Sequence, residues 1–302
     1  MFDPPKPVAS EVFATLPAKY RKPRRTAWAD ANHSGAELDC YIEGPAFDRD
    51  GNLYFVDIPF GRIFRASPSG AIDLVAEYDG EPNGLKVHPD GRIFVADYRN
   101  GVLVLDPATG KVTPVVDRFR SERFKGVNDL FIADDGTIYF TDQGQTGLHD
   151  PTGRVFRLTS AGSLQLFLGG IPSPNGLSLN ADGTALYIAV TRANAIWRAP
   201  ILADGTTTKV GLFIQLSGGI GPDGMAVDEE GGVVVAHVGL GVTWRFDAMG
   251  RPTHRIDAIV GQRPTNVAFG GADGRTLFMT ESTTGSILTA RLPVAGRRTL
   301  PG

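Results

Sequence analysis

A pattern that recurs six times along the chain limits what it can fold into. Each copy starts with a side chain that carries an oxygen and has, eight residues later, a glycine preceded by an acidic residue. Asp-Gly, the usual form, is a strong hairpin signal between two apolar runs, because both central residues of the turn need positive φ. The starting residues are spaced 40, 45, 47, 48 and 43 residues apart: Glu43, Asn83, Asn128, Asn175, Asp223 and Asn266.

Each repeat contains short strand-like runs separated by turn signals. In the second repeat these runs are residues 84–88, 93–96, 102–105 and 111–116. Four strands in 40 to 50 residues, repeated six times, predict an all-β, six-bladed β-propeller that forms a single domain over residues 1–302. The sixth repeat lacks a fourth strand. Residues 8–16, at the other end of the chain, can supply it and would close the ring without a loose edge.

Residues 17–41 do not fit the repeat. This segment is polar, is interrupted by prolines and shows no helical pattern of useful length. Long insertions of this kind are usually functional or disordered. We therefore expect residues 17–41 to form a lid over one face or an interface.

Composition excludes several classes of partner. The net charge is −3 with no dominant block of either sign, which argues against a nucleic-acid partner or an acidic membrane surface. No apolar run is long enough to span a bilayer, and the N-terminus lacks the pattern of a signal peptide. The single cysteine, Cys40, excludes an intrachain disulfide and fits a reducing compartment. A cytoplasmic protein is expected, and a homo-oligomer stays open.

Propeller geometry turns the repeat into a candidate site. The first strand of each blade lines the channel, so the six starting residues should meet at one mouth. The second strands return to that face and end in a further, mostly acidic set one layer out: Asp57, Asp97, Asp142, Val190, His237 and Glu281. A ring of unpaired carboxylates and amides is costly, so a bound cation is expected. All-oxygen donors favour Ca²⁺, with Mg²⁺ or Mn²⁺ as alternatives; Zn²⁺ usually recruits His or Cys.

Some of the six starting residues, and some of the acids that end the second strands, are also explained by a purely structural role. Pro-Asn-Gly is a common turn, so Asn83 is also explained as a satisfied loop residue, and the same holds for Asn266. Asp57 and Asp97 are interpreted as hairpin anchors. Asp142 suits an anchoring role or a contact with a ligand equally well.

Five stretches, in this order, resemble the motifs of the SMP-30/gluconolactonase family: residues 42–45, 127–129, 141–142, 173–177 and 222–228. The resemblance covers about residues 41–291 and implies a six-bladed propeller that hydrolyses sugar lactones and related esters. It also implies one divalent cation at the channel mouth, bound by Glu43, Asn128, Asn175 and Asp223. Lys125 stands where many of these lactonases have an asparagine.

This resemblance implies metal-assisted hydrolysis of a cyclic ester, in which the cation, Ca²⁺ or else Mn²⁺, Mg²⁺ or Zn²⁺, acts as a Lewis acid. Asp223 is the candidate general base, with direct nucleophilic attack as the alternative. His237 also fits a polar residue that closes a strand end. A phosphotriesterase-like hydrolase and a non-catalytic propeller with a structural Ca²⁺ are the other functions that the sequence leaves open. The candidate substrate contacts are Asn83, Lys125, Asp142, Arg192 and His237.

Overall fold

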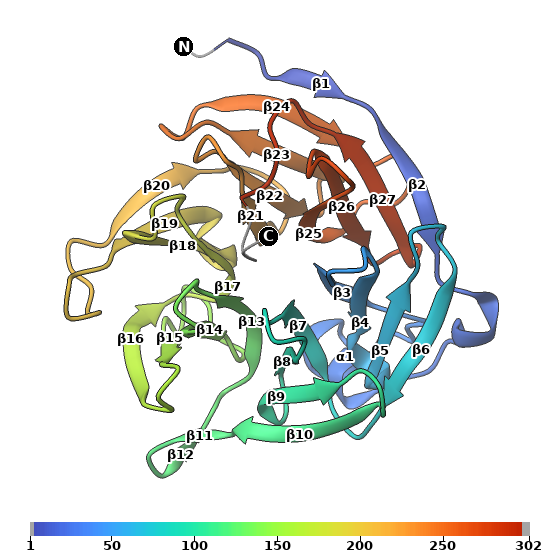
Figure 1. Ribbon diagram of the computed structural model, residues 1–302, viewed down its shortest axis with the longest axis horizontal. Helices are drawn as coiled ribbons and strands as arrows, with labels where there is room; N and C mark the ends of the chain where they lie inside the picture. Colours follow the sequence, from blue (N-terminus) through green and yellow to red (C-terminus); the bar gives the residue numbers. More distant parts are fainter. Residues whose placement is uncertain (1–2, 298–302) are drawn as a thin grey trace.

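The structure confirms the predicted fold. The computed structural model describes residues 3–297, which form a closed ring of six antiparallel blades around a central channel (Figure 1). The first strand of each blade along the chain lies innermost. Blade one consists of β3 (Ile42–Phe47), β4 (Leu53–Asp57), β5 (Arg62–Ala66) and β6 (Ile72–Glu77). Blade two consists of β7 (Pro82–Val87), β8 (Ile93–Asp97), β9 (Gly101–Asp106) and β10 (Lys111–Val116). Blade three consists of β13 (Val127–Ile132), β14 (Ile138–Asp142), β15 (Gly153–Leu158) and β16 (Leu164–Ile171).

The second half of the ring repeats this order. Outside the blades, residues 3–297 form only short elements: η1 (Ala18–Tyr20), α1 (Ala27–Asn32), η2 (Ile58–Phe60), η3 (Thr191–Ala193) and the hairpin of β11 (Arg118–Phe119) with β12 (Glu122–Arg123). Blades four to six contain β17 (Pro174–Leu179), β18 (Ala185–Val190), β19 (Ala195–Pro200) and β20 (Gly211–Gln215); β21 (Gly221–Val227), β22 (Val233–Val238), β23 (Val242–Phe246) and β24 (Pro252–Asp257); and β25 (Pro264–Gly270), β26 (Thr276–Glu281) and β27 (Ser286–Arg291).

The N-terminal segment closes the ring, as predicted. β2 (Ser10–Thr15) pairs antiparallel with β27 and becomes the fourth strand of blade six. The sequence did not predict β1 (Lys6–Val8), which pairs parallel with β24 of blade five. Ser10 fixes the crossing between the two blades, because its hydroxyl donates to Asp257 O (2.6 Å) and accepts from Ile259 N (2.9 Å). The segment therefore clasps two neighbouring blades.

The apolar core lies between the blades. Within the described residues, six buried clusters each join two neighbouring blades. The second strands of blades one to five are buried along their whole length. Burial on both faces explains why their sequences are continuous apolar runs rather than alternating ones.

The insertion is more ordered than the sequence suggested. Residues 17–41 contain the short helix α1, which Thr26 caps by accepting a hydrogen bond from Ala29 N (3.2 Å). Trp28 of this helix is buried against the cluster between blades one and two. A six-residue helix is too short to show a periodic pattern, and its stability comes from this packing.

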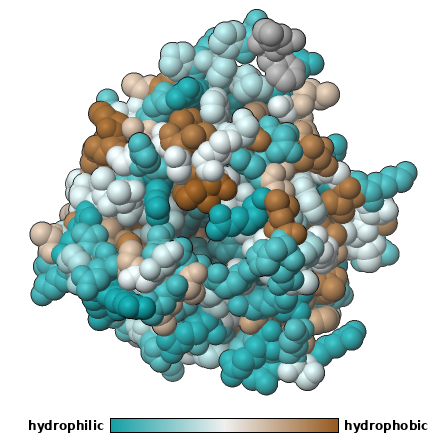
Figure 2. Space-filling model, turned by 180° about the vertical axis from the view of Figure 1, so that it is seen from behind, coloured by the Kyte–Doolittle hydropathy of each residue, from teal (hydrophilic) through white to brown (hydrophobic). Residues whose placement is uncertain are grey.

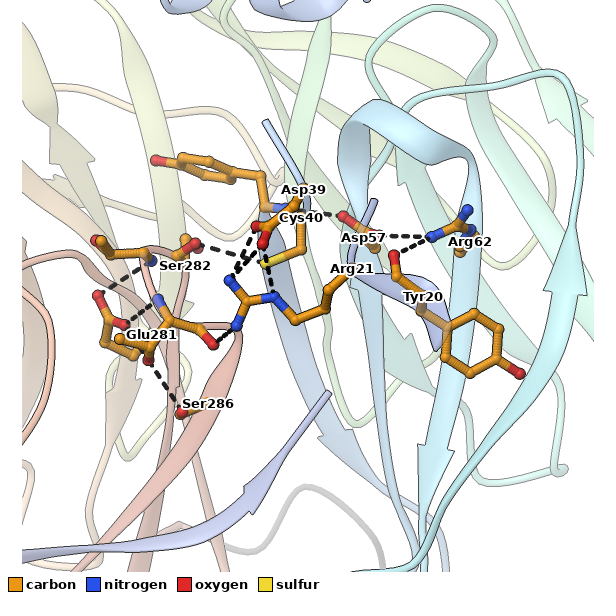
Figure 3. A network of polar contacts seen from close by, with 12 residues as sticks. Tyr20, Arg21, Asp39, Cys40, Asp57, Arg62, Glu281, Ser282 and Ser286 are labelled. Atoms are coloured by element: carbon orange, nitrogen blue, oxygen red, sulfur yellow. Dashed lines mark hydrogen bonds and ion pairs between the residues drawn. The ribbon is translucent and has the colours of Figure 1, made fainter. Parts of the chain in front are cut away.

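Polar contacts fix the insertion to the blades on either side of it (Figure 3). Arg21 forms a two-pronged pair with Asp39 through hydrogen bonds of 2.9 Å each, and it also donates to Thr284 O of blade six. Arg62 of blade one donates to Tyr20 O at 3.0 Å. The insertion is thus held at the junction of blades one and six. No helix in the described part of the chain is long and apolar enough to cross a bilayer.

Candidate functional site

Five of the six residues predicted to meet at the channel mouth lie at equivalent positions of their blades. Each of these residues directly follows the one that pairs with the last residue of the second strand or, in blade five, with the last but one. The five residues are Glu43, Asn83, Asn128, Asn175 and Asp223. In each of these blades the strand register shifts at this point, and such bulges redirect a side chain. The five side chains are buried, with 3 to 8% of their surface exposed. Together with Thr265 of blade six they are called the inner ring below.

The prediction for blade six is wrong by one residue. Pro264 pairs with Glu281 at the strand end, so Thr265 takes the inner-ring position, and Asn266 lies one residue deeper in the channel. Thr265 uses its hydroxyl to donate to Ile42 O at 2.9 Å. The constant eight-residue spacing misled the prediction because β25 has one more residue between mouth and hairpin than β21.

Asn266 and Asp129 together close the channel beneath the inner ring, and we call this pair the floor. Asn266 Nδ2 donates to Asp129 Oδ2 (3.1 Å) and to Glu43 Oε2 (2.9 Å). In four other blades the corresponding residue is glycine, and a Cβ there would collide with a neighbouring blade. At Gly84 it would meet Asp129, and at Gly224 it would meet Asn266. Glycine in these blades therefore leaves the room that the floor side chains fill.

A cavity of about 500 Å³ lies below the floor, at the hairpin end of the channel. Its lining is mainly apolar, and the segment after β27 borders it, with Arg297 N donating to Val227 O (2.8 Å). Lys86, which also borders it, places its ammonium 3.8 Å from Asp129 Oδ1. The oxygen donors are gathered above the floor, so we place the functional site at the mouth and not in this cavity.

Hydrogen bonds orient one amide of the inner ring. Asn128 Nδ2 donates to Gln143 Oε1 (2.8 Å), and Gln143 Nε2 donates in turn to Ser173 Oγ (2.9 Å). Asn175 is close enough to Asp223 to lower the pKa of that carboxyl group. Because its nitrogen is occupied by Gln143, Asn128 keeps its carbonyl oxygen available for a ligand.

The two carboxyl groups of the inner ring are costly to ionise without a counter-charge. Burial, followed by the charges of Asp223 and Asp129, holds the pKa of Glu43 well above its usual value. Burial and Asp129 raise the pKa of Asp223 to about 8. Residues 3–297 contain no group of three His, Cys, Asp or Glu side chains that could hold a metal. Two carboxylates with two amide oxygens nevertheless fit a hard divalent cation, which would stabilise both ionised groups.

The acids at the ends of the second strands have a different environment. Four of them, called the outer carboxylates below, accept hydrogen bonds from the backbone of the residue that stands two positions before the inner ring. Asp142, for example, accepts from Gly126 N (2.9 Å) and Lys125 N (2.6 Å), and also binds Arg154. The pairs, carboxylate first, are Asp57–Tyr41, Asp97–Glu81, Asp142–Gly126 and Glu281–Arg263.

Two of the predicted substrate contacts are not placed where a substrate could reach them. Asp142 has no exposed surface, and its oxygens are occupied as described above. His237 is 1% exposed, its Nε2 lies 3.0 Å from Gly218 O, and its Nδ1 accepts from Trp244 Nε1 (3.3 Å). Burial lowers the pKa of His237, so it remains a neutral residue that holds a loop. The structural explanation fits both residues.

The other predicted contacts lie nearer the mouth. Lys125 and Arg192 are both exposed. Lys125 donates its ammonium to Thr152 Oγ1. The charge of Arg192 lowers the pKa of Asp223, which places the guanidinium within electrostatic reach of the inner ring. Asn83 belongs to the inner ring and is 6% exposed. Figure 2 views the ring from the side opposite to Figure 1 and shows a hollow at the centre of a mostly hydrophilic face.

Sequence reasoning missed an aromatic and cationic group beside the mouth. His33 and Trp28 of the insertion pack on Tyr41, with ring centroids 5.0 and 4.8 Å away. Arg263 NH1 donates to His33 Nδ1 at 3.1 Å. Burial and the charges of Asp223 and Glu43 raise the pKa of Tyr41. The only sequence signal was position, because Tyr41 and Arg263 each stand two residues before an inner-ring residue.

Known proteins resemble the whole propeller. The model of the SMP-30/gluconolactonase/LRE-like region matches residues 42–283. A gluconolactonase of Zymomonas mobilis is 34% identical over 275 residues, which span 80% of this chain and 76% of that protein. Lactonase drp35 of Staphylococcus saprophyticus is 27% identical over 256 residues, which span 80% of this chain and 77% of that protein.

Solved structures agree on the architecture. A gluconolactonase structure from Xanthomonas campestris superposes with a TM-score of 0.75 at 26% identity, covering 94% of this chain and 99% of that one. A calcium-binding protein, regucalcin of Agrobacterium tumefaciens, superposes with a TM-score of 0.77 at 23% identity over 99% of both chains. At that level of identity the second comparison supports the shared fold alone.

Proposed function

The chain belongs to the SMP-30/gluconolactonase family, and from this premise we propose that it is a divalent-metal-dependent hydrolase that opens a lactone. The proposed ligands of the cation are Glu43, Asn128, Asn175 and Asp223, and the proposed ion is Ca²⁺. The observation that carries the proposal is the shared position and burial of these donors. Two carboxyl groups and two amides lie buried at equivalent positions of four blades, and the nitrogen of Asn128 is already occupied by Gln143, so its carbonyl oxygen is available for an ion.

The ion and the chain have separate roles in this proposal. Once bound, a divalent cation supplies Lewis acidity toward the lactone carbonyl oxygen. Asp223 takes a proton from the attacking water as the water oxygen bonds to the carbonyl carbon. When the ring C–O bond breaks, the proton passes to the departing alkoxide. The inner ring and the floor position the water, and Asn83, Lys125 and Arg192 contact the rest of the substrate.

The test combines turnover with a binding readout. Protein stripped with a chelator is assayed on a panel of neutral aldonolactones, before and after addition of Ca²⁺, and its melting temperature is followed in parallel. We expect turnover and the higher melting temperature to return together with Ca²⁺. Full turnover in the stripped protein would contradict the proposal. A rise in melting temperature without turnover of any lactone would indicate a binding propeller with a structural ion.

A single-turnover reaction in ¹⁸O-labelled water separates the two roles of Asp223. A general base directs the label straight into the product carboxylate. A nucleophile would instead deliver an unlabelled oxygen to the product in the first turnover and leave the label on Asp223. We expect labelled product in the first turnover.

A further inference from the structure

The charge around the mouth is uneven. We call the residues two positions before the inner ring the rim: Tyr41, Glu81, Gly126, Ser173, Gly221 and Arg263. The two ionic rim residues are Glu81 in blade two and Arg263 in blade six. Arg192 lies in η3, directly after β18 of blade four, and its charge lowers the pKa of Asp223. Two arginines thus flank blade five, on the opposite side of the ring from Glu81.

Neither arginine is neutralised by the protein. Among residues 3–297, Arg192 and Arg263 form no ion pair with any carboxylate, although many other arginines of the chain do. Arg263 is instead held by His33, whose Nδ1 accepts its hydrogen bond at 3.1 Å. Burial and the nearby Arg263 lower the pKa of His33 to about 4. His33 is therefore a neutral acceptor that positions the guanidinium and leaves its full charge for a ligand.

Positioning a cation in this way has a chemical consequence. A half-buried guanidinium without a carboxylate partner is well suited to bind a planar anion through two parallel hydrogen bonds. Arg263 is half-buried, its backbone is fixed by Glu281, and its side chain is fixed by the insertion. A neutral sugar lactone has no group that needs two such cations beside the carbonyl site.

We propose that the lactone opened at this site carries an anionic substituent, a carboxylate in the first instance, which Arg263 binds with Arg192 on the other side of Asp223. This inference rests on the proposed lactonase function. It gives residues 17–41 a specific task, since His33 orients the anion-binding arginine. It also gives the substrate a direction, with its charged end toward blades four to six and away from Glu81.

Two commercial lactones form a matched pair for the test. D-glucaro-1,4-lactone and D-glucono-1,4-lactone differ only at C6, which is a carboxylate in the first and a CH₂OH in the second. We expect a kcat/KM at least about ten-fold higher for the anionic lactone, the size of one charge-assisted hydrogen bond. The preference should shrink as salt is added, because exposed charges are screened. An equal kcat/KM, or a preference for the neutral lactone, would overturn the proposal.

Variants assign the preference to residues. Arg263→Gln, which retains a donor for His33, should lower kcat/KM for the anionic lactone by about ten- to a hundred-fold more than for the neutral one. Arg192→Gln should act in the same direction with a smaller effect, since Arg192 is exposed. Arg251→Gln is the matched control, because Arg251 lies in the β23–β24 turn at the hairpin end. This variant should leave kcat/KM unchanged for both lactones. Equal losses for both lactones in Arg263→Gln would mean that Arg263 only supports the fold.

Failure of the proposed function would be visible separately. If neither compound is hydrolysed, the lactonase proposal fails, and the same two lactones then serve as unreacted ligands in titration calorimetry. Tighter binding of the anionic lactone that Arg263→Gln abolishes would still support the anion site. Equal affinities for the two lactones, or no binding of either, would reject it.

Discussion

The inner ring and the outer carboxylates are two circles of polar residues in one propeller, and they differ in what their oxygens bind. The outer carboxylates are fully buried and accept backbone N–H groups of the rim. The inner ring keeps amide and carboxylate oxygens that the protein leaves largely unused. Residues of similar chemistry, one strand apart, thus have separate tasks. The outer carboxylates fix the backbone of the rim, and the rim in turn fixes the inner-ring residues that follow it along the chain. Buried acids in a repeat are informative about function only after their partners are known.

The largest effect should come from the inner ring. Asp223→Asn retains a carbonyl oxygen but cannot take a proton, so we expect kcat/KM on lactones to fall about 10³-fold, within the range of general base catalysis. The free energy of unfolding without cation should stay equal or rise, because a buried ionisable group is removed. Steady-state kinetics and urea denaturation measure the two. A large loss of stability would place Asp223 with the outer carboxylates.

The outer circle should respond in the opposite way. Asp142→Ala removes the acceptor of Gly126 N and leaves the half-buried Arg154 with only the exposed Glu122 as a partner, so we expect the free energy of unfolding to fall by about 3 kcal/mol. Denaturant titration of the purified variant checks this. Asp142→Asn, which keeps an acceptor, should lose less. If the Ala variant unfolds like the wild type but loses all turnover, Asp142 contacts substrate after all.

Among the outer carboxylates, Asp57 should make the free energy of unfolding depend on pH. Burial raises the pKa of Asp57 to about 7, and its Oδ2 has no hydrogen-bond donor among the described residues. A carboxyl whose pKa is raised on folding contributes stability at low pH and loses it as the pH rises through the folded pKa. Between pH 5.5 and 8, the wild type should therefore lose about 1–2 kcal/mol relative to Asp57→Asn.

Urea denaturation of both proteins at the two pH values measures this difference. Asp273→Asn is the control, because Arg291 holds the pKa of Asp273 at about 2 and the group is ionised throughout that range. Parallel pH profiles for the wild type and Asp57→Asn would show that Asp57 is ionised in the folded protein over the whole interval.

The smallest effect should come from within the inner ring itself. Asn83 shares the register of the proposed ligands but is not among them, so Asn83→Ala should change the Ca²⁺ dissociation constant less than about three-fold, whereas Asn128→Ala should weaken it at least about ten-fold. Titration calorimetry with Ca²⁺ compares the two variants. Equal weakening would add Asn83 to the ligands and enlarge the ion site to five residues.

Most of the fold could be predicted from local repeats in the sequence. The acid-Gly turns and the apolar runs around them were enough to predict six blades, and the missing fourth strand of the last repeat pointed to a closing strand in residues 8–16, where β2 lies. The same repeat placed five of the inner-ring residues. It failed for Asn266, because spacing counts residues whereas strand register decides which side chain reaches the mouth.

The parts that sequence could not supply are contacts between distant segments. His33 and Arg263 are 230 residues apart and meet only through the ring. The anchoring role of Asp142 likewise depends on where the backbone of Gly126 lies, and the sequence left that choice open.

The clasp made by β1 and β2 also sets an order of events during synthesis. Residues 10–15 are synthesised long before their partners at 286–291. Until β27 is made, β2 has no partner and exposes an unpaired edge, which is the kind of surface that recruits other chains. Pairing over such a sequence separation is slow. We therefore expect completion of the propeller to follow translation, and removal of residues 1–15 to leave a chain that aggregates instead of folding.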